Sequence, residues 1–327
     1  MKKQLLCLIM LLCIPISAGC QREIPSFSRS GFALNTAVTV TVYDLPKEAA
    51  EKALAAGFDE IERLEAMLSV TREGSDIAKV NEAGGKPITV SDETAALLLQ
   101  AKQYGELSNG AFDITIRPLT ALWDFSAENP TVPSAETLSE AAKAVDYRWL
   151  TVNETTVQLP PNAALDLGGI AKGYIADSVR QVLQQQGVTS AIIDLGGNIV
   201  VCGNKRGKAF RIGIKDPQST TQLCAVISGE DISAVTSGVY ERGFTVDGVR
   251  YHHLLDPQTG MPVNNGLSSV TIVCQSSAMA DALSTACFVM GEERATKLIT
   301  SLDGVEALLV RADGTMQATD GLLYEKP

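Results

Sequence analysis

A short apolar stretch, a glycine pair and an amphipathic helix follow one another over residues 163–187, and this order constrains the fold more than any other feature. Residues 163–165 predict a buried strand. Apolar side chains then recur at helical spacing until Gly187. They are Ile170, Tyr174, Ile175, Val179, Val182 and Leu183. We therefore expect Gly168 and Gly169 at a strand-to-helix turn.

Such a turn can approach a ligand closely. Glycine has no Cβ, and the free amides at the start of a helix favour an anion such as a phosphate. Asp166 stands where the strand ends, so its carboxylate can hold a metal or a hydroxyl. A glycine pair before a helix is equally compatible with a tight turn alone. The segment matches neither the Walker phosphate loop nor the dinucleotide fingerprint.

The rest of the chain alternates between helical and extended patterns. A second Asp-Leu-Gly-Gly occupies residues 194–197 and suggests a second close backbone approach. Apolar spacing predicts helices at 50–68, 75–82, 91–110, 134–145, 170–187 and 278–290. It predicts strands at 36–43, 149–159, 191–195, 211–214, 224–227, 270–273 and finally 305–310. The interleaved order and short connections indicate an α+β fold in a single large domain.

The N-terminus has the layout of a secretion signal. Lys2 and Lys3 precede an apolar run over residues 5–16, which is too short to span a membrane. The small residues before Cys20 resemble the lipobox of bacterial lipoproteins. We expect a signal peptide at 1–19, and a lipidated Cys20 with a polar tether at 20–30. The chain would then be lipid-anchored to the extracytoplasmic face of the cell membrane. An ordinary secretory signal is the alternative.

The net charge is −11, which argues against nucleic acid as a partner and suits a bound divalent cation. Four cysteines remain after Cys20 and stand in apolar contexts, without a Cys-x-x-Cys pair. Small buried hydrophobic side chains are the favoured interpretation, and a disulfide between two of them stays open. The four are Cys202, Cys224, Cys274 and Cys287.

Two stretches near the end of the chain offer chemistry. His252 and His253 are the only two histidines and lie on a predicted strand, so at most one of them faces a given site. Asp281 and Thr285 are four residues apart on one helix face. Their oxygens, completed by a backbone carbonyl and water, suit magnesium together with phosphates. A buried Asp281 satisfied by hydrogen bonds is the alternative.

Seven motifs follow one another along the chain: the Thr-bearing opening strand, FDITIRPLTALWDF, LDLGGIAKGY, IDLGGN, TSG, HLLDPQTGMP and ADALSTA. In this order they resemble the FAD:protein FMN transferases, the ApbE-like lipoproteins, over residues 31 to 320. The resemblance implies a T-fold-like flavin transferase core with two lobes, spanning residues 31–327. It implies an enzyme that transfers the FMN phosphate of FAD to a Ser or Thr of a partner protein and releases AMP. The implied acceptor is a flavoprotein subunit of a membrane redox complex.

The resemblance also implies roles for single residues. Asp281, Thr285 and the carbonyl of Gly169 would bind Mg²⁺, and His253 would lie nearest the reacting phosphate. Eight residues would line the FAD site: Leu34, Ala111, Phe112, Asp113, Asp166, Lys172, Ser237 and Leu254.

Two departures from the family pattern concern the flavin ring. Leu34-Asn35 replaces a common Met-Gly, and an aromatic residue common near Ser69 is replaced around Val70-Thr71. A Mg²⁺-dependent FAD pyrophosphatase and a non-catalytic flavin-binding lipoprotein are the alternative functions.

Overall fold

A computed structural model describes residues 25–125, 127–219 and 221–327. The predicted signal peptide and Cys20 lie outside these residues. Within the described part of the chain, every helix is too short or too polar to cross a bilayer.

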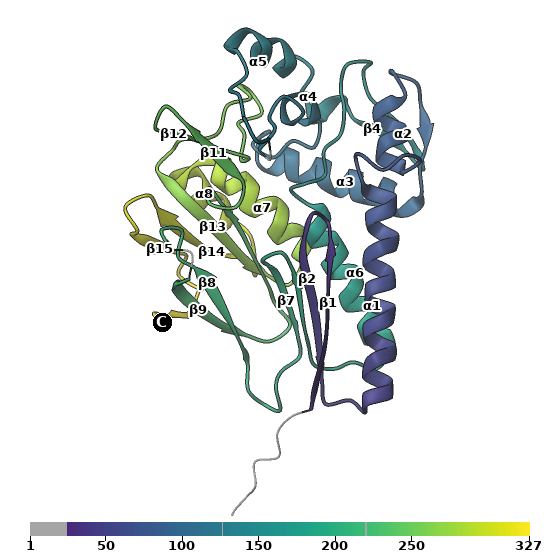
Figure 1. Cartoon of the computed structure of the whole chain (residues 1–327), viewed down its shortest axis with the longest axis vertical. Helices are drawn as coiled ribbons and strands as arrows, with labels where there is room; N and C mark the ends of the chain where they lie inside the picture. Colours follow the sequence, from purple (N-terminus) through teal and green to yellow (C-terminus); the bar gives the residue numbers. More distant parts are fainter. Residues whose placement is uncertain (1–24, 126, 220) are drawn as a thin grey trace, which may run out of the picture.

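An antiparallel sheet of eight strands forms the centre of the molecule, in the order β1-β2-β6-β7-β10-β13-β14-β15 (Figure 1). Its strands are β1 Ser26–Ala33, β2 Thr36–Tyr43, β6 Ala191–Leu195, β7 Asn198–Cys202, β10 Ser233–Gly238, β13 Leu267–Cys274, β14 Glu306–Arg311 and β15 Met316–Ala318. Successive side chains of a strand point to opposite faces. In β6, Ile193 packs toward the helices, whereas Ile192 packs toward a second, smaller sheet.

Three helices cover one face of the central sheet. They are α1 Lys47–Leu68, α6 Ala171–Gln185 and α7 Ser277–Met290, and α6 packs against both of the others (Figure 1). Helix α8 Glu292–Ile299 continues this layer beside α7. The three-stranded sheet of β8 Phe210–Lys215, β9 Leu223–Gly229 and β16 Tyr324–Glu325 covers the other face. The middle strands of the sheet are therefore buried on both sides.

Shorter elements gather at one end of this sandwich, at the top of Figure 1. They comprise α2 Asp76–Glu82, α3 Asp92–Leu107, α4 Arg117–Thr120, α5 Ala135–Ala142, the 3-10 turn η1 Tyr147–Trp149, the sheet of β3 Ile88–Thr89, β4 Thr151–Asn153 and β5 Thr156–Gln158, and the hairpin of β11 Gly243–Val246 and β12 Val249–His252. A separate aromatic cluster, which includes Trp123, Phe244 and Tyr251, packs the hairpin against α4 and α5. The mixed α+β prediction is confirmed.

The predicted polar tether is too long at its C-terminal end. Residues 26–30 belong to β1, the edge strand that pairs with β2. Hydroxyl pairs on the exposed face explain how so polar a sequence forms a strand. Ser28 bonds Thr41 at 2.8 Å and Ser30 bonds Thr39 at 2.9 Å.

The predicted strand at 163–165 is also wrong. The segment is buried but forms only an isolated bridge between Ala164 and Ile116. The Asn81 side chain binds both the amide and the carbonyl of Leu165, at 2.6 and 3.0 Å, in the place that a neighbouring strand would take. Two smaller differences concern ends: α5 stops at Ala142, and β15 and β16 follow the strand predicted as the last.

The four cysteines in the described part of the chain are free. Burial raises the pKa of Cys202, Cys274 and Cys287 to about 12, so these thiols stay protonated at neutral pH. They serve as small apolar side chains, as predicted.

Candidate active site

The crossing of α6 and α7 brings the two predicted halves of the site together. A Cβ on Gly173 would lie 2.2 Å from the carbonyl oxygen of Ser277, so only glycine permits this approach. The amide of Gly173 donates to Asp281 Oδ2 at 2.9 Å, and Lys172 Nζ lies 3.7 Å from Asp281 Oδ1. The first turn of α6 is thus held directly on the Asp281 carboxylate.

Gly169, Asp281 and Thr285 line one small region beside this crossing. A Cβ on Gly169 would lie 3.3 Å from Thr285 Oγ1 and 3.1 Å from the Phe112 ring. Ser237 Oγ lies 3.3 Å from Thr285 Oγ1. Asp281 is only 3% exposed, and a buried carboxylate is stabilised by a cation.

The donor chemistry fits Mg²⁺. A carboxylate, a hydroxyl and a backbone carbonyl are hard oxygen ligands of the kind that Mg²⁺ accepts together with water and phosphate. Among the described residues, no three His, Cys, Asp or Glu side chains are grouped so that they could hold a metal ion, so a cation here would depend on Asp281 and neutral oxygens.

Asp166 sits between the glycine turn and α4. Its Oδ1 accepts from the amide of Gly168 at 2.9 Å, and its Oδ2 accepts from Thr120 Oγ1 at 2.7 Å. Arg117 lies 3.9 Å from the same carboxylate. Asp166 therefore fixes the turn and remains partly accessible to a ligand hydroxyl.

Asp113 is placed differently. Its carboxylate is 8% exposed and accepts from the amide and hydroxyl of Thr115 and from the amide of Tyr147. Burial raises its pKa. The side chain organises the loop that carries Ala111 and Phe112, whose ring packs against Gly169.

The β1–β2 hairpin presents Leu34 at its two-residue turn. Both turn residues have positive φ, 54° for Leu34 and 58° for Asn35. The amide of Leu34 donates to Glu65 Oε1 of α1 at 2.8 Å, which holds the turn against the helix layer.

The two histidines face different surroundings, as the strand alternation predicts. His252 is buried, its Nε2 lies 3.0 Å from the carbonyl oxygen of Val263, and its ring meets Phe288 edge-on. The His253 side chain is 27% exposed, and its Nε2 lies 3.9 Å from Glu241 Oε2. Burial and then the charge of Lys172 lower the pKa of His253 to about 4, so the ring is neutral at pH 7.

Glu241 lies beside His253 and was not predicted from the sequence. Burial raises the pKa of its carboxyl above the ordinary value, and the positive charge of Lys172 offsets only part of that rise. Lys172 thus acts electrostatically on both Glu241 and His253 and also lies beside Asp281. The available signal was a charged pair, Glu241-Arg242, soon after the Thr-Ser-Gly motif.

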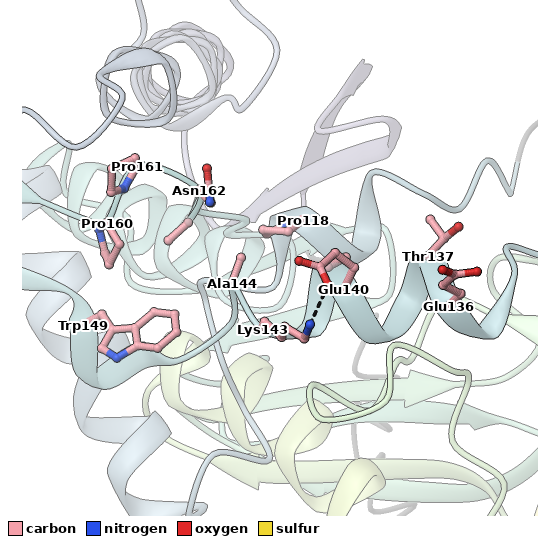
Figure 2. A pocket seen from close by; sticks show the side chains of 12 residues that line it. Pro118, Glu136, Thr137, Glu140, Lys143, Ala144, Trp149, Pro160, Pro161 and Asn162 are labelled. Carbon is pink, nitrogen blue, oxygen red and sulfur yellow. Dashed lines mark hydrogen bonds and ion pairs between the residues drawn. The ribbon is translucent and has the colours of Figure 1, made fainter.

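A cavity of about 750 Å³ lies elsewhere, between α5, η1 and the 160–163 loop (Figure 2). Trp149, Pro160 and Pro161 form its apolar side, and Glu140 pairs with Lys143 at 2.6 Å on the other. The residues that line it include none of the predicted site residues. The catalytic hypothesis therefore rests on the α6–α7 crossing.

Comparison with known proteins shows the family and the fold of this chain. Residues 34–309 match the sequence profile of the ApbE family. The chain is 37% identical to the FAD:protein FMN transferase of Treponema pallidum, over 97% of this chain and 93% of that protein. The crystal structure of the ApbE protein from Thermotoga maritima superposes with a TM-score of 0.84 at 35% identity, covering 90% of this chain and 97% of that one.

The flavin transferase ApbE from Vibrio cholerae superposes with a TM-score of 0.81 at 30% identity, covering 91% of this chain and 97% of that one. These similarities extend from β2 to β14 and include the glycine turn, the β11–β12 hairpin and α7. The chain belongs to the ApbE family.

Proposed function

We propose that this chain is a Mg²⁺-dependent FAD:protein FMN transferase that links FMN through a phosphoester to a Ser or Thr of a target flavoprotein. The observation that carries the proposal is the α6–α7 crossing. It sets Gly169, Asp281 and Thr285 together, while Lys172 connects Asp281 electrostatically to His253.

The residues divide into two tasks. Asp281, Thr285 and the Gly169 carbonyl would hold Mg²⁺, which supplies charge neutralisation on the pyrophosphate when bound. Lys172 adds a positive charge at the start of α6, whose free amides favour phosphate. Asp166 and Leu34 are available to the rest of the FAD molecule.

His253 is suited to the proton transfer. Its ring is neutral at pH 7 and partly accessible, so Nε2 can accept the proton of an acceptor hydroxyl. The hydroxyl oxygen forms a bond to the FMN phosphorus. The bond from that phosphorus to the AMP oxygen breaks, and AMP leaves with the electron pair.

The test combines the purified chain with FAD, Mg²⁺ and a candidate acceptor domain. AMP release and a fluorescent acceptor band on a denaturing gel would support transfer, and both should disappear with EDTA. AMP without a labelled acceptor would favour the pyrophosphatase. FAD binding without AMP would favour a flavin-binding protein.

His253→Ala separates binding from chemistry. We expect a rate loss of about 100-fold or more with FAD affinity retained, because general-base catalysis contributes about that much. Loss of FAD binding in this variant would instead make His253 a binding group.

We further propose that the chain is lipid-anchored at Cys20 and acts on a flavoprotein subunit of a membrane redox complex outside the cytoplasm. The order of Lys2, Lys3, the apolar run 5–16 and Cys20 supports the anchor. The acceptor is the one that the family resemblance implies. Cells given labelled palmitate should label the chain, and Cys20→Ser should remove the label. Label that persists in that variant would contradict the anchor.

A further inference from the structure

The loop after β10 carries a carboxyl group that faces the proposed base. Glu241 follows β10, and His253 follows β12. Both the amide and Nδ1 of His253 lie close to the carbonyl oxygen of Arg242, at 3.2 and 3.4 Å. The neighbour of Glu241 is thus the backbone anchor of His253, so the two side chains are held together by the loop itself.

This anchor determines which ring nitrogen can act as a base. A carbonyl oxygen only accepts hydrogen bonds, so Nδ1 of the neutral ring carries the hydrogen and Nε2 has the lone pair. Nε2 lies 3.9 Å from Glu241 Oε2, which is longer than a hydrogen bond. Nε2 can therefore accept a proton from an incoming hydroxyl, and the Glu241 carboxyl group lies beside it.

We propose that Glu241 is a positioning residue that stabilises the imidazolium formed at His253 and orients that ring after proton abstraction. The inference rests on the proposed role of His253 as the base. It gives a function to a residue whose side chain is 35% exposed beside His253, which is 27% exposed. An acceptor hydroxyl approaching His253 from solvent would reach Nε2 beside Glu241.

Charge explains why a base here needs such a partner. When Nε2 takes the hydroxyl proton, the ring gains a positive charge close enough to Lys172 to be disfavoured by it. The Glu241 carboxylate offsets that repulsion, and the new Nε2–H can turn toward Oε2 and away from the phosphoester product. The proton is then passed to solvent, because both side chains are partly exposed.

The experiment uses four variants of the full mature chain, namely Glu241→Gln, Glu241→Asp, His253→Ala and the Glu241→Gln, His253→Ala double variant. FMN transfer is measured at varied FAD with saturating Mg²⁺ and acceptor domain, together with melting temperature. Glu325→Gln is the matched control, because Glu325 is an exposed carboxylate that pairs with Arg211 on β8, away from His253.

We expect Glu241→Gln to lower kcat by about 10- to 100-fold, the range found when the outer partner of a functional histidine is removed. The KM for FAD and the melting temperature should stay near wild-type values. Glu241→Asp, which keeps the charge, should recover most of the rate. In the His253→Ala background, Glu241→Gln should have no further effect, because its partner is already gone.

A fully additive loss in the double variant would overturn the inference, as would a loss confined to FAD affinity or melting temperature. Wild-type kcat in Glu241→Gln, with His253→Ala still slow, would remove the role of Glu241 and leave that of His253. Wild-type kcat in His253→Ala would reject the proposed base itself.

Discussion

The two Asp-Leu-Gly-Gly segments have the same sequence and different structures. At 166–169 the glycines precede α6 and have no positive φ, and a Cβ on Gly169 would meet Phe112 and Thr285 of the site. At 194–197 the glycines form the two-residue turn between β6 and β7, with φ of 66° and 90°. The first pair is needed for a close approach to the site, whereas the second is needed for a backbone conformation and, at Gly196, also for a close approach to Thr36.

The aspartates differ in the same way. Asp194 accepts from the amide of Gly197 at 2.9 Å and closes its own turn. Asp166 accepts from Gly168 and also reaches Thr120 on α4. A glycine pair therefore has no fixed meaning, and the element that follows it decides which property of glycine is used.

The largest expected effect comes from Asp281, whose carboxylate binds the start of α6, the helix that follows the glycine turn at 166–169. Asp281→Ala should lower Mg²⁺-dependent AMP release by at least about 100-fold, because neutral oxygens alone hold the cation poorly. Asp194→Ala is the matched control at the second turn and should keep the rate within about 2-fold, since it loses one hydrogen bond worth about 1 kcal/mol. Unchanged AMP release in Asp281→Ala would reject the metal-site assignment.

The next effect concerns the close approach itself. In Gly169→Ala the new methyl would lie 3.1 Å from the Phe112 ring and 3.3 Å from Thr285 Oγ1, so both neighbours must shift. We expect the Mg²⁺ concentration for half-maximal AMP release to rise about 10-fold, as when a metal ligand is displaced. The free energy of unfolding should change by less than about 1.5 kcal/mol. A stability loss without a change in Mg²⁺ dependence would mean that Gly169, like the glycines at 194–197, is needed for the fold and not for the cation.

At the second turn we expect the reverse outcome. Gly196→Ala combines a positive φ with a methyl 2.4 Å from Thr36 Oγ1. The two together should lower the free energy of unfolding by about 2–4 kcal/mol, measured by urea denaturation. The rate per folded molecule should stay within about 2-fold of the wild type. A selective loss of Mg²⁺ affinity would contradict the division between the two turns.

Local patterns were sufficient for much of this structure. Helices α1, α3, α6 and α7 and the central strands β2, β6, β13 and β14 follow from apolar spacing, whereas β1, β7, β10 and β15 of the same sheet were not predicted. The pairing of Asp281 with Thr285 follows from helix periodicity. The flavin transferase interpretation came from a resemblance in several ordered motifs, and family membership is confirmed.

The remainder depends on contacts between distant residues. Asn81 takes the place of a strand partner for Leu165 across 84 positions. Asp177 of α6 accepts from the amides of Ser277 and Ala278 and so caps α7. The charged pair Glu241-Arg242 does not by itself indicate a partner, and only the return of the chain through the β11–β12 hairpin brings Glu241 to His253.

The smallest expected effect isolates backbone conformation from packing. A Cβ on Gly197 would have no heavy atom within 4 Å, so Gly197→Ala should cost only the strain of φ = 90°, about 1 kcal/mol. Gly197→Asn should cost less, because asparagine enters the left-handed region more readily. Urea denaturation of Gly196→Ala, Gly197→Ala and Gly197→Asn should therefore give decreasing losses. If Gly197→Ala were as damaging as Gly196→Ala, the contact with Thr36 could not be what distinguishes Gly196, and φ alone would account for both glycines of this turn.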